Sequence, residues 1–242
     1  MTSVELSAPA KLTLSLRITG VRADGFHLID AEMVSLDLAD RITITEGAVG
    51  LTADGPFAGG MALGADNLVT RALDLVGRTA AVHLDKRIPH GGGLGGGSSD
   101  AAAVLRWAGI TDPAVAVGLG ADVAFCLVGG RARVRGIGEL VEPLPFRPLD
   151  ITLVIPPVQV ATPAVYRMWD DLGGPRAEGP NDLEPAAIAV APELERWRQR
   201  IGDATGLAPT LAGSGATWFL VGRHTVDLDG ATVVHTRTIP AN

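Results

Sequence analysis

The chain contains very little lysine and almost no cysteine. Of its 20 basic residues only two, Lys11 and Lys86, are lysines, and the rest are arginines. Lysine offers a compact point charge and arginine a planar fork, so a lysine kept among arginines can mark a site that needs the point charge. We apply this interpretation to Lys11 and attribute Lys86 to sequence drift. The single cysteine, Cys126, cannot form an internal disulfide, which fits a reducing cytoplasm.

The sequence also lacks a long hydrophobic run and an excess of positive charge. No apolar stretch reaches the roughly 18 residues of a membrane span, and residues 1–18 alternate like a strand, unlike a signal peptide. The net charge of −7 argues against a general nucleic-acid-binding protein. We therefore expect neither a membrane nor a nucleic-acid partner, although a local glycine loop can bind phosphate on an acidic protein.

The hydrophobic pattern predicts an α+β protein. Residues 11–18 alternate as a half-buried strand with Lys11 on its polar face. Prolines clustered at 143–148 favour a boundary there, so we expect one domain at residues 1–146 and a second at 147–242. Further strands are expected at 28–38, 41–45, 50–53, 81–86, 131–135, 151–155, 217–221 and 231–236. Helices are expected at 67–76, capped by Asp66, and at 101–107, 162–169 and 192–201.

The strongest local pattern lies between Gly91 and Asp100, where six glycines fall in seven positions. Glycine costs conformational entropy, so such a run indicates a backbone that curls around a bulky anion with its N–H groups inward. The next helix would direct its positive end at the same anion, with Ser98 and Ser99 as hydroxyl donors and helix cap. A flexible linker rarely joins a strand directly to a helix, and the Walker A and Rossmann patterns do not fit.

Residues 89–102, PHGGGLGGGSSDAA, closely resemble the nucleotide-binding loop of the GHMP kinases. Within this family, the stretch GLGGGSSDAA resembles the form of the loop seen in the members that act on 4-diphosphocytidyl-2-C-methyl-D-erythritol. Residues 9–12 and 22–27 resemble the N-terminal signature of these kinases, and residues 120–123 and 136–139 the central one. Residues 162–163, 181–184 and 213–216 match the C-terminal half. The resemblance thus covers nearly the whole chain.

This resemblance implies a GHMP kinase fold with two lobes. The first would resemble the second domain of ribosomal protein S5, and the second would be ferredoxin-like, with the substrates meeting between them. It implies ATP-dependent phosphorylation of the 2-hydroxyl of the cytidine diphosphate-linked methylerythritol, in the non-mevalonate route to isoprenoid precursors. Mg²⁺ should accompany ATP; its protein ligands are unassigned, with Ser99 as a candidate. The chain would be a monomer or homodimer acting on this small molecule in the cytoplasm.

The resemblance also assigns roles to individual residues. Asp122 would accept the hydroxyl proton, and Lys11 would stabilise that carboxylate and hold the nucleophile or the γ-phosphate. Without the resemblance, Asp122 could equally be a helix N-cap and Lys11 a solvated strand lysine. The implied ATP-binding residues are Pro89, His90, Gly91, Gly92, Gly93, Leu94, Gly95, Gly96, Gly97, Ser98 and Ser99. The implied substrate-binding residues are Thr13, Phe26, His27, Thr162 and Tyr166, with His27 at the base edge and Tyr166 stacking on it.

The chain departs from the family pattern at several positions. Thr13 replaces a usual asparagine, Phe26 a common tyrosine and Ala124 a frequent proline, and the stretch 107–120 is short. Two alternatives therefore stay open: a GHMP kinase for another alcohol, such as mevalonate, homoserine or a sugar, and a nucleotide-binding relative without catalysis. The segment 25–27 favours the cytidyl substrate, and the presence of Lys11 and Asp122 favours catalysis. The histidines His83, His90, His224 and His235 lack metal-ligand spacing.

Overall fold

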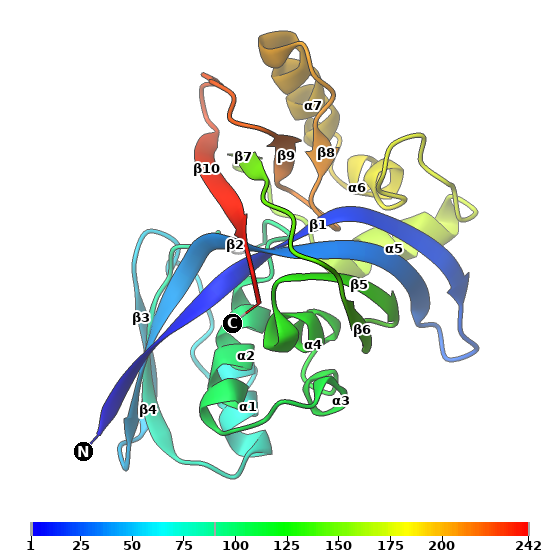
Figure 1. Cartoon of the computed structure of the whole chain (residues 1–242). Helices are drawn as coiled ribbons and strands as arrows, with labels where there is room; N and C mark the ends of the chain where they lie inside the picture. Colours follow the sequence, from blue (N-terminus) through cyan, green and yellow to red (C-terminus); the bar gives the residue numbers. More distant parts are fainter. Residues whose placement is uncertain (1, 90, 242) are drawn as a thin grey trace.

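The fold is organised around one long strand, β2 (His27–Glu46). The computed structural model describes residues 2–89 and 91–241. β1 (Ser3–Val21) runs antiparallel to β2 along one edge for its whole length. Successive segments of the other edge pair with β5 (Arg131–Gly136), β10 (Thr232–Ile239) and β4 (Ala80–Asp85). Figure 1 shows β1 and β2 crossing the molecule together as its two longest ribbons.

Helices and shorter strands complete the two ends of this framework. Below the long strands in Figure 1 lie α1 (Leu68–Leu75), α2 (Gly96–Trp107), α3 (Pro113–Ala116) and α4 (Ala121–Val128). β3 (Gly50–Asp54) pairs with β4, and β6 (Leu140–Pro143) pairs with β5. The opposite end holds β7 (Asp150–Ile155), β8 (Thr210–Leu211), β9 (Trp218–Val221), α5 (Thr162–Asp171), α6 (Glu184–Val190) and α7 (Glu193–Thr205). β10 pairs with both β2 and β7 and so joins the two ends in one sheet.

The α+β prediction is confirmed, but several boundaries differ. The strands expected at 28–38 and 41–45 form one continuous strand, since Ala39 and Asp40 between them pair with Pro9 and Ala8 of β1. Asn67, and not Asp66, caps α1, since its side chain accepts a hydrogen bond of 2.8 Å from the Val69 N–H. Helix α2 begins at Gly96, inside the glycine run. The elements α3, α4, α6, β6 and β8 have no counterpart among the predicted elements.

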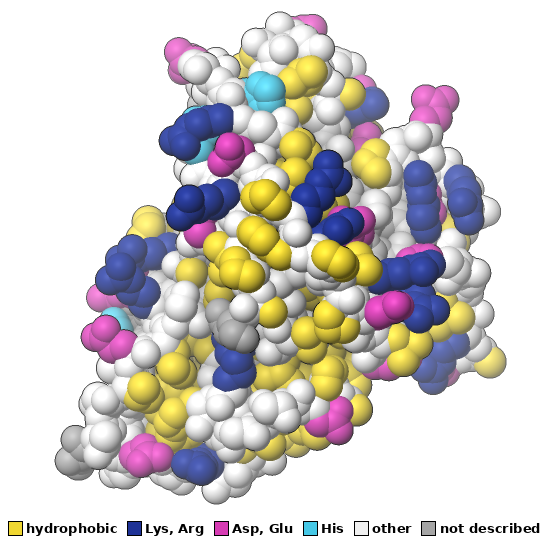
Figure 2. All heavy atoms as spheres, in the orientation of Figure 1, with side chains coloured by type: hydrophobic (Ala, Val, Ile, Leu, Met, Phe, Trp, Pro, Cys, Tyr) yellow, Lys and Arg dark blue, Asp and Glu magenta, His cyan; other side chains and the backbone are white. Residues whose placement is uncertain are grey.

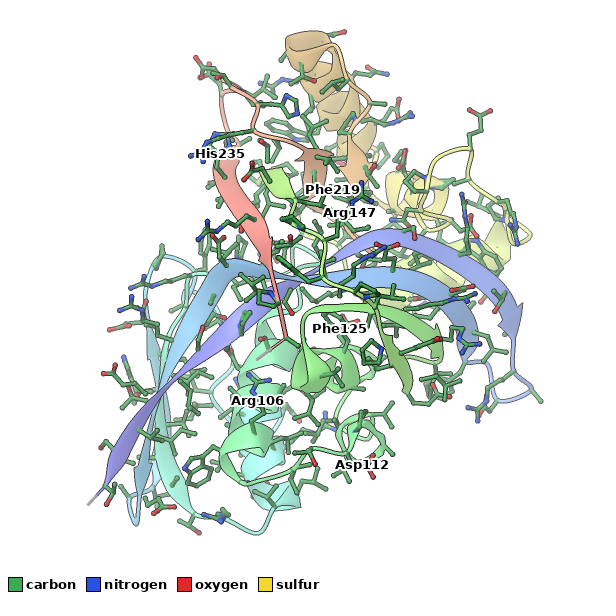
Figure 3. All side chains as sticks on the ribbon, in the orientation of Figure 1. Arg106, Asp112, Phe125, Arg147, Phe219 and His235 are labelled. Atoms are coloured by element: carbon green, nitrogen blue, oxygen red, sulfur yellow. The ribbon has the colours of Figure 1, made fainter. Side chains whose placement is uncertain are left out.

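Two hydrophobic clusters form the core, and the first of them extends into both ends of the molecule. The first packs the alanine-rich α2 and Phe125 of α4 under the sheet, and the second groups Leu12, Leu36 and Phe219 between β1, β2 and β9. Figure 3 shows Phe125 and Phe219 on opposite sides of β1 and β2. Arg106, also labelled there, donates a hydrogen bond of 2.6 Å to the Cys126 carbonyl and so ties α2 to α4.

Within residues 2–89 and 91–241, none of the helices combines the length and the apolar character needed to cross a bilayer. The longest, α7, has 13 residues, far short of the roughly 20 that a span requires.

Buried Asp182 ties β1 to the C-terminal half of the chain. Its carboxylate accepts hydrogen bonds from Arg17 Nη1 (2.7 Å), the Ile18 N–H (3.0 Å) and the Ala177 N–H (3.1 Å). Two backbone hydrogen bonds flank it: the Leu16 N–H donates to the Pro180 carbonyl and the Asp182 N–H to the Leu16 carbonyl.

We predict that Asp182→Ala lowers the free energy of unfolding by about 3 kcal/mol, because buried donors lose a charged acceptor. Urea denaturation followed by tryptophan fluorescence measures the change. Asp182→Asn, which keeps one acceptor oxygen, is the control and should lose less. Equal stability of Asp182→Ala and the unmodified protein would show that this carboxylate does not hold β1 in place.

Candidate active site

A cleft of about 840 Å³ lies where β1, the glycine loop, α4 and α5 meet. It has the size of an ordinary small-molecule site. Both halves of the chain line it, including the glycine turn 213–215. Nearly all the residues expected to bind ligand lie in its wall: Lys11, Thr13, Phe26, His27, Pro89, Gly91, Gly92, Gly93, Leu94, Gly95, Gly96, Gly97, Ser98, Asp122, Thr162 and Tyr166.

The glycine loop is held in place by backbone contacts on both sides. On one side the Lys11 N–H donates to the Leu94 carbonyl over 3.0 Å. On the other, the Thr217 N–H donates to the Gly92 carbonyl over 3.3 Å. Gly93 has a φ of +76°, and a Cβ there would lie 2.2 Å from the Ala212 carbonyl oxygen. Only glycine therefore allows this loop and the 212–217 turn to meet backbone to backbone.

Helix α2 directs its N-terminus into the cleft. Gly95 is its N-cap with a φ of +67°, and Gly96, Gly97 and Ser98 form its first turn. The free N–H groups of a first turn carry partial positive charge and suit a phosphate. The expected serine cap is wrong. Ser99 is fully buried and donates its hydroxyl to the Pro9 carbonyl over 2.6 Å, so of the two serines only Ser98 lines the cleft.

The glycines also make room for other parts of the protein. A Cβ on Gly95 would lie 2.6 Å from Lys11 Cγ, and one on Gly96 would lie 3.2 Å from Ile88. Gly97 is less constrained, since the nearest atom, on Leu68, is 3.8 Å away. Part of the glycine run is therefore required to seat Lys11 and Ile88 against the loop.

Lys11 and Asp122 form an ion pair at the floor of the cleft. Lys11 Nζ lies 3.0 Å from Asp122 Oδ2 and donates a 3.3 Å hydrogen bond to Thr13 Oγ1. Lys11 follows an irregularity in the β1–β2 register and is 5% exposed, so it is no solvated edge lysine. Asp122 lies in the first turn of α4, whose N-cap is Gly120, so it is no N-cap. The helix N-terminus and Lys11 both place positive charge beside this carboxylate.

Aromatic side chains gather at the other end of the cleft. The His27 ring centroid lies 4.8 Å from that of Tyr166 and 5.5 Å from that of Trp169. Burial, reinforced by the charge of Asp122, raises the pKa of Tyr166, so this phenol stays neutral. Phe26 is 56% exposed at the rim. Thr162 Oγ1 lies 2.8 Å from Ser214 Oγ, which joins α5 to the 213–215 turn.

The structure adds residues that the sequence did not suggest. Asp170 and Arg167 of α5 line the cleft, although nothing in their spacing singles them out. Ser99 is the expected ligand-binding residue that lies behind the wall, and His90 falls outside the described residues. On the face in Figure 2, basic side chains are scattered among acidic ones. Elsewhere on the surface, Arg133 Nη2 lies 2.6 Å from Asp30 Oδ2, so surface arginines neutralise local carboxylates.

Lys86 is the clearest correction to the sequence interpretation, which attributed it to drift. Its ammonium lies between the carboxylates of Asp40 and Asp100, and all three residues are almost completely buried. Asp40 also accepts hydrogen bonds from the N–H groups of Arg87 and Ile88, the latter at 2.8 Å. The cluster therefore fixes both the chain entering the glycine loop and helix α2 leaving it.

The buried cluster shifts the pKa values of Lys86 and Asp100. Burial lowers the pKa of Lys86, but Asp100 and Asp40 more than offset this, so the pKa lies above its usual value. Burial raises the pKa of Asp100 to about 7, with Lys86 opposing and Asp40 adding to the shift. Asp100 Oδ1 is buried without a hydrogen-bond partner among the described residues. Protonation of Asp100 would leave the cluster neutral overall.

Comparisons with known proteins agree with this geometry. The family of GHMP kinases N terminal domains matches residues 67–130, which include the glycine loop and Asp122. The 4-diphosphocytidyl-2-C-methyl-D-erythritol kinase of Paracoccus denitrificans is 42% identical over 232 residues, covering 88% of this chain and 85% of that protein. That of Ruegeria pomeroyi is also 42% identical, over 90% of this chain and 88% of its own length.

Solved structures confirm the expected fold. A crystal structure of 4-(cytidine 5'-diphospho)-2C-methyl-D-erythritol kinase superposes with a TM-score of 0.73 at 32% identity, covering 97% of this chain and 99% of that one. Homoserine kinase from Cytophaga hutchinsonii superposes with a TM-score of 0.64 at 17% identity, covering 100% and 96%. The second likeness shows the fold alone.

We predict that Asp100 makes stability depend on pH. Its pKa is about 7 when folded and 3.8 in the ordinary state, so between these values the folded chain binds more protons. Its contribution to the free energy of unfolding therefore falls as pH rises from 3.8 to about 7. Asp100→Asn should lack this fall, so its stability relative to the unmodified protein should improve with pH. Urea denaturation at several pH values measures this; parallel curves for both proteins would contradict the assignment.

Proposed function

Since this chain belongs to the GHMP kinases, as a member of the 4-diphosphocytidyl-2-C-methyl-D-erythritol kinase family, we propose that Lys11 and Asp122 perform its phosphoryl transfer. The enzyme uses ATP to phosphorylate the 2-hydroxyl of 4-diphosphocytidyl-2-C-methyl-D-erythritol in isoprenoid precursor biosynthesis. The observation that carries the residue assignment is the 3.0 Å ion pair of Lys11 and Asp122 beside the glycine loop.

ATP would place its phosphates against the glycine loop. The backbone of residues 91–97 and the N-terminus of α2 surround this part of the cleft. Aligned N–H groups there can bind phosphate oxygens, and the carboxylates of Asp40 and Asp100 are turned away from them toward Lys86. Lys11, whose Cγ the loop contacts at Gly95, would bring its ammonium to the transferred phosphoryl group.

The substrate hydroxyl would be deprotonated by Asp122. Phosphoryl transfer requires the attacking oxygen to be aligned and its proton to be accepted. Asp122 Oδ2 forms an ion pair with Lys11 Nζ. The Asp122 side chain is about one third exposed and lines the open cleft. Lys11 orients the carboxylate before the reaction and neutralises charge that develops on the phosphoryl oxygens during it.

Magnesium would be held mainly by ATP. Within the described residues, no group of three His, Cys, Asp or Glu side chains could hold a metal ion. This fits Mg²⁺, which keeps several waters and binds through substrate phosphates. Ser98, in the first turn of α2, would add one hydroxyl ligand, whereas Ser99 is committed to the Pro9 carbonyl. When bound, the ion would neutralise phosphate charge.

The cytidine diphosphate part would occupy the aromatic end of the cleft. Tyr166 offers a stacking face, His27 a hydrogen-bonding ring and Thr13 a hydroxyl beside Lys11. Arg167 supplies a second cation for the substrate's diphosphate.

The proposal also includes a domain boundary between residues 146 and 147, a monomeric or homodimeric state and a cytoplasmic location. The buried free thiol of Cys126 supports the location.

The test of this function is a phosphorylation assay with purified protein and ATP. The cytidyl substrate is compared with mevalonate and homoserine under the same conditions. We expect transfer to the cytidyl substrate in strong preference to the other two. Preference for either of the other alcohols would overturn the substrate assignment and leave the GHMP kinase fold standing.

We predict that Asp122→Asn lowers kcat by at least about 100-fold, because it removes the proton acceptor and little volume. ATP binding, measured by calorimetry, should change little. Asp112→Asn is the matched control, since Asp112 caps α3 and does not line the cleft. A kcat near the unmodified value in Asp122→Asn would exclude general-base catalysis by this residue.

We predict that Tyr166→Ala weakens use of the cytidyl substrate by roughly 1–3 kcal/mol through lost base stacking. The loss should appear in KM or kcat/KM for the cytidyl substrate, while KM for ATP stays nearly constant. Leu172→Ala, at the exposed end of the same helix, serves as the control. A change confined to KM for ATP would place the cytidine elsewhere.

A further inference from the structure

His27 and Asp170 come from distant parts of the chain and meet in the wall of the cleft. His27 is the first residue of β2, and Asp170 lies in the last turn of α5. His27 Nε2 lies 2.8 Å from Asp170 Oδ1. The His27 side chain is 10% exposed and that of Asp170 48%. The histidine is therefore enclosed, and its carboxylate partner approaches from the solvent side.

This contact decides which ring nitrogen carries the proton. An ionised carboxylate only accepts hydrogen bonds, so Nε2 must be the donor. In the neutral ring the other nitrogen, Nδ1, is then an acceptor. Tyr166 and Trp169 lie against the same ring and restrict its rotation. Asp170 thus fixes both the tautomer and the orientation of His27.

We propose that Asp170 is a positioning residue that makes the pocket select cytosine over uracil. The inference rests on the proposed function, in which His27 faces the edge of the base. Cytosine presents an exocyclic amine that donates hydrogen bonds, where uracil presents a carbonyl that only accepts them. A histidine whose Nδ1 is held as an acceptor pairs with the amine of cytosine. The carbonyl of uracil would instead face a second acceptor.

Losing Asp170 would remove this discrimination while leaving the pocket in place. Without the carboxylate, His27 can move its proton to Nδ1 or rotate, and it can then donate to the uracil carbonyl. Sites built around a hydrogen bond to one substrate group reject analogues lacking that group strongly, because a buried polar atom stays unpaired. We therefore expect the preference for cytosine to fall about tenfold or more in Asp170→Ala, by gain of uracil binding and loss of cytosine binding together.

The binding test uses CDP and UDP as probes and needs no turnover. Calorimetric titrations are made with the nucleotide site filled by ADP, so that the probes report on the cytidine end alone. The unmodified protein should prefer CDP, and Asp170→Ala should bring the two affinities within a few-fold of each other. Asp171→Ala, an exposed neighbour at the end of α5, is the matched control and should keep the preference. An undiminished preference for CDP in Asp170→Ala would overturn the proposal.

The tautomer can be observed directly by nitrogen NMR of protein labelled with ¹⁵N-histidine. The chain has five histidines, and His27→Gln identifies the resonances of His27. We expect a ring protonated at Nε2 and free at Nδ1 in the unmodified protein, and a mixture of tautomers in Asp170→Ala. A ring protonated at Nδ1, or at both nitrogens, in the unmodified protein would overturn the proposal. Absence of turnover with the cytidyl substrate would instead reject the proposed function, since the spectrum does not depend on activity.

Discussion

The buried ammonium of Lys86 is the contact on which the active site depends. Taking three charges out of water is costly, and such a cluster persists only when every charge has partners close by. Here those partners come from β2, from the end of β4 and from α2, so the three elements must meet at one point. The glycine loop spans the gap between two of them. A loop with so little intrinsic stiffness acquires a fixed shape because both of its ends are anchored to the same cluster.

The geometry of the proposed catalytic pair, Lys11 and Asp122, follows from this anchoring. Helix α2 packs on α4 and is bonded to it through Arg106, and the first turn of α4 carries Asp122. The loop in turn contacts Lys11 through Leu94 and Gly95. The N-termini of α2 and α4 and the ammonium of Lys11 therefore converge on one cleft. The second half of the chain closes this cleft through β10, which pairs with both β2 and β7.

Local chemistry explains what could be predicted from the sequence. The glycine run, the alternation of β1 and the family motifs located the loop, Lys11, Asp122 and the aromatic pocket, because each depends on neighbouring residues. The role of Lys86 depends on Asp40, 46 positions away, and Asp170 meets His27 across 143 positions. No local pattern encodes such pairs. Ser99 was assigned to the ligand for the same reason, since its true partner is the carbonyl of Pro9.

The burial of both lysines leaves the outer surface of this enzyme without primary ε-amines. The side chains of Lys11 and Lys86 are only 6% and 3% exposed, and the remaining basic residues are arginines. Acetyltransferases and ubiquitin ligases require an ε-amine that projects from the surface. Lys11 faces only the cleft and Lys86 is enclosed by Asp40 and Asp100, so these enzymes can modify a lysine of this chain only after the structure that holds its active site has opened.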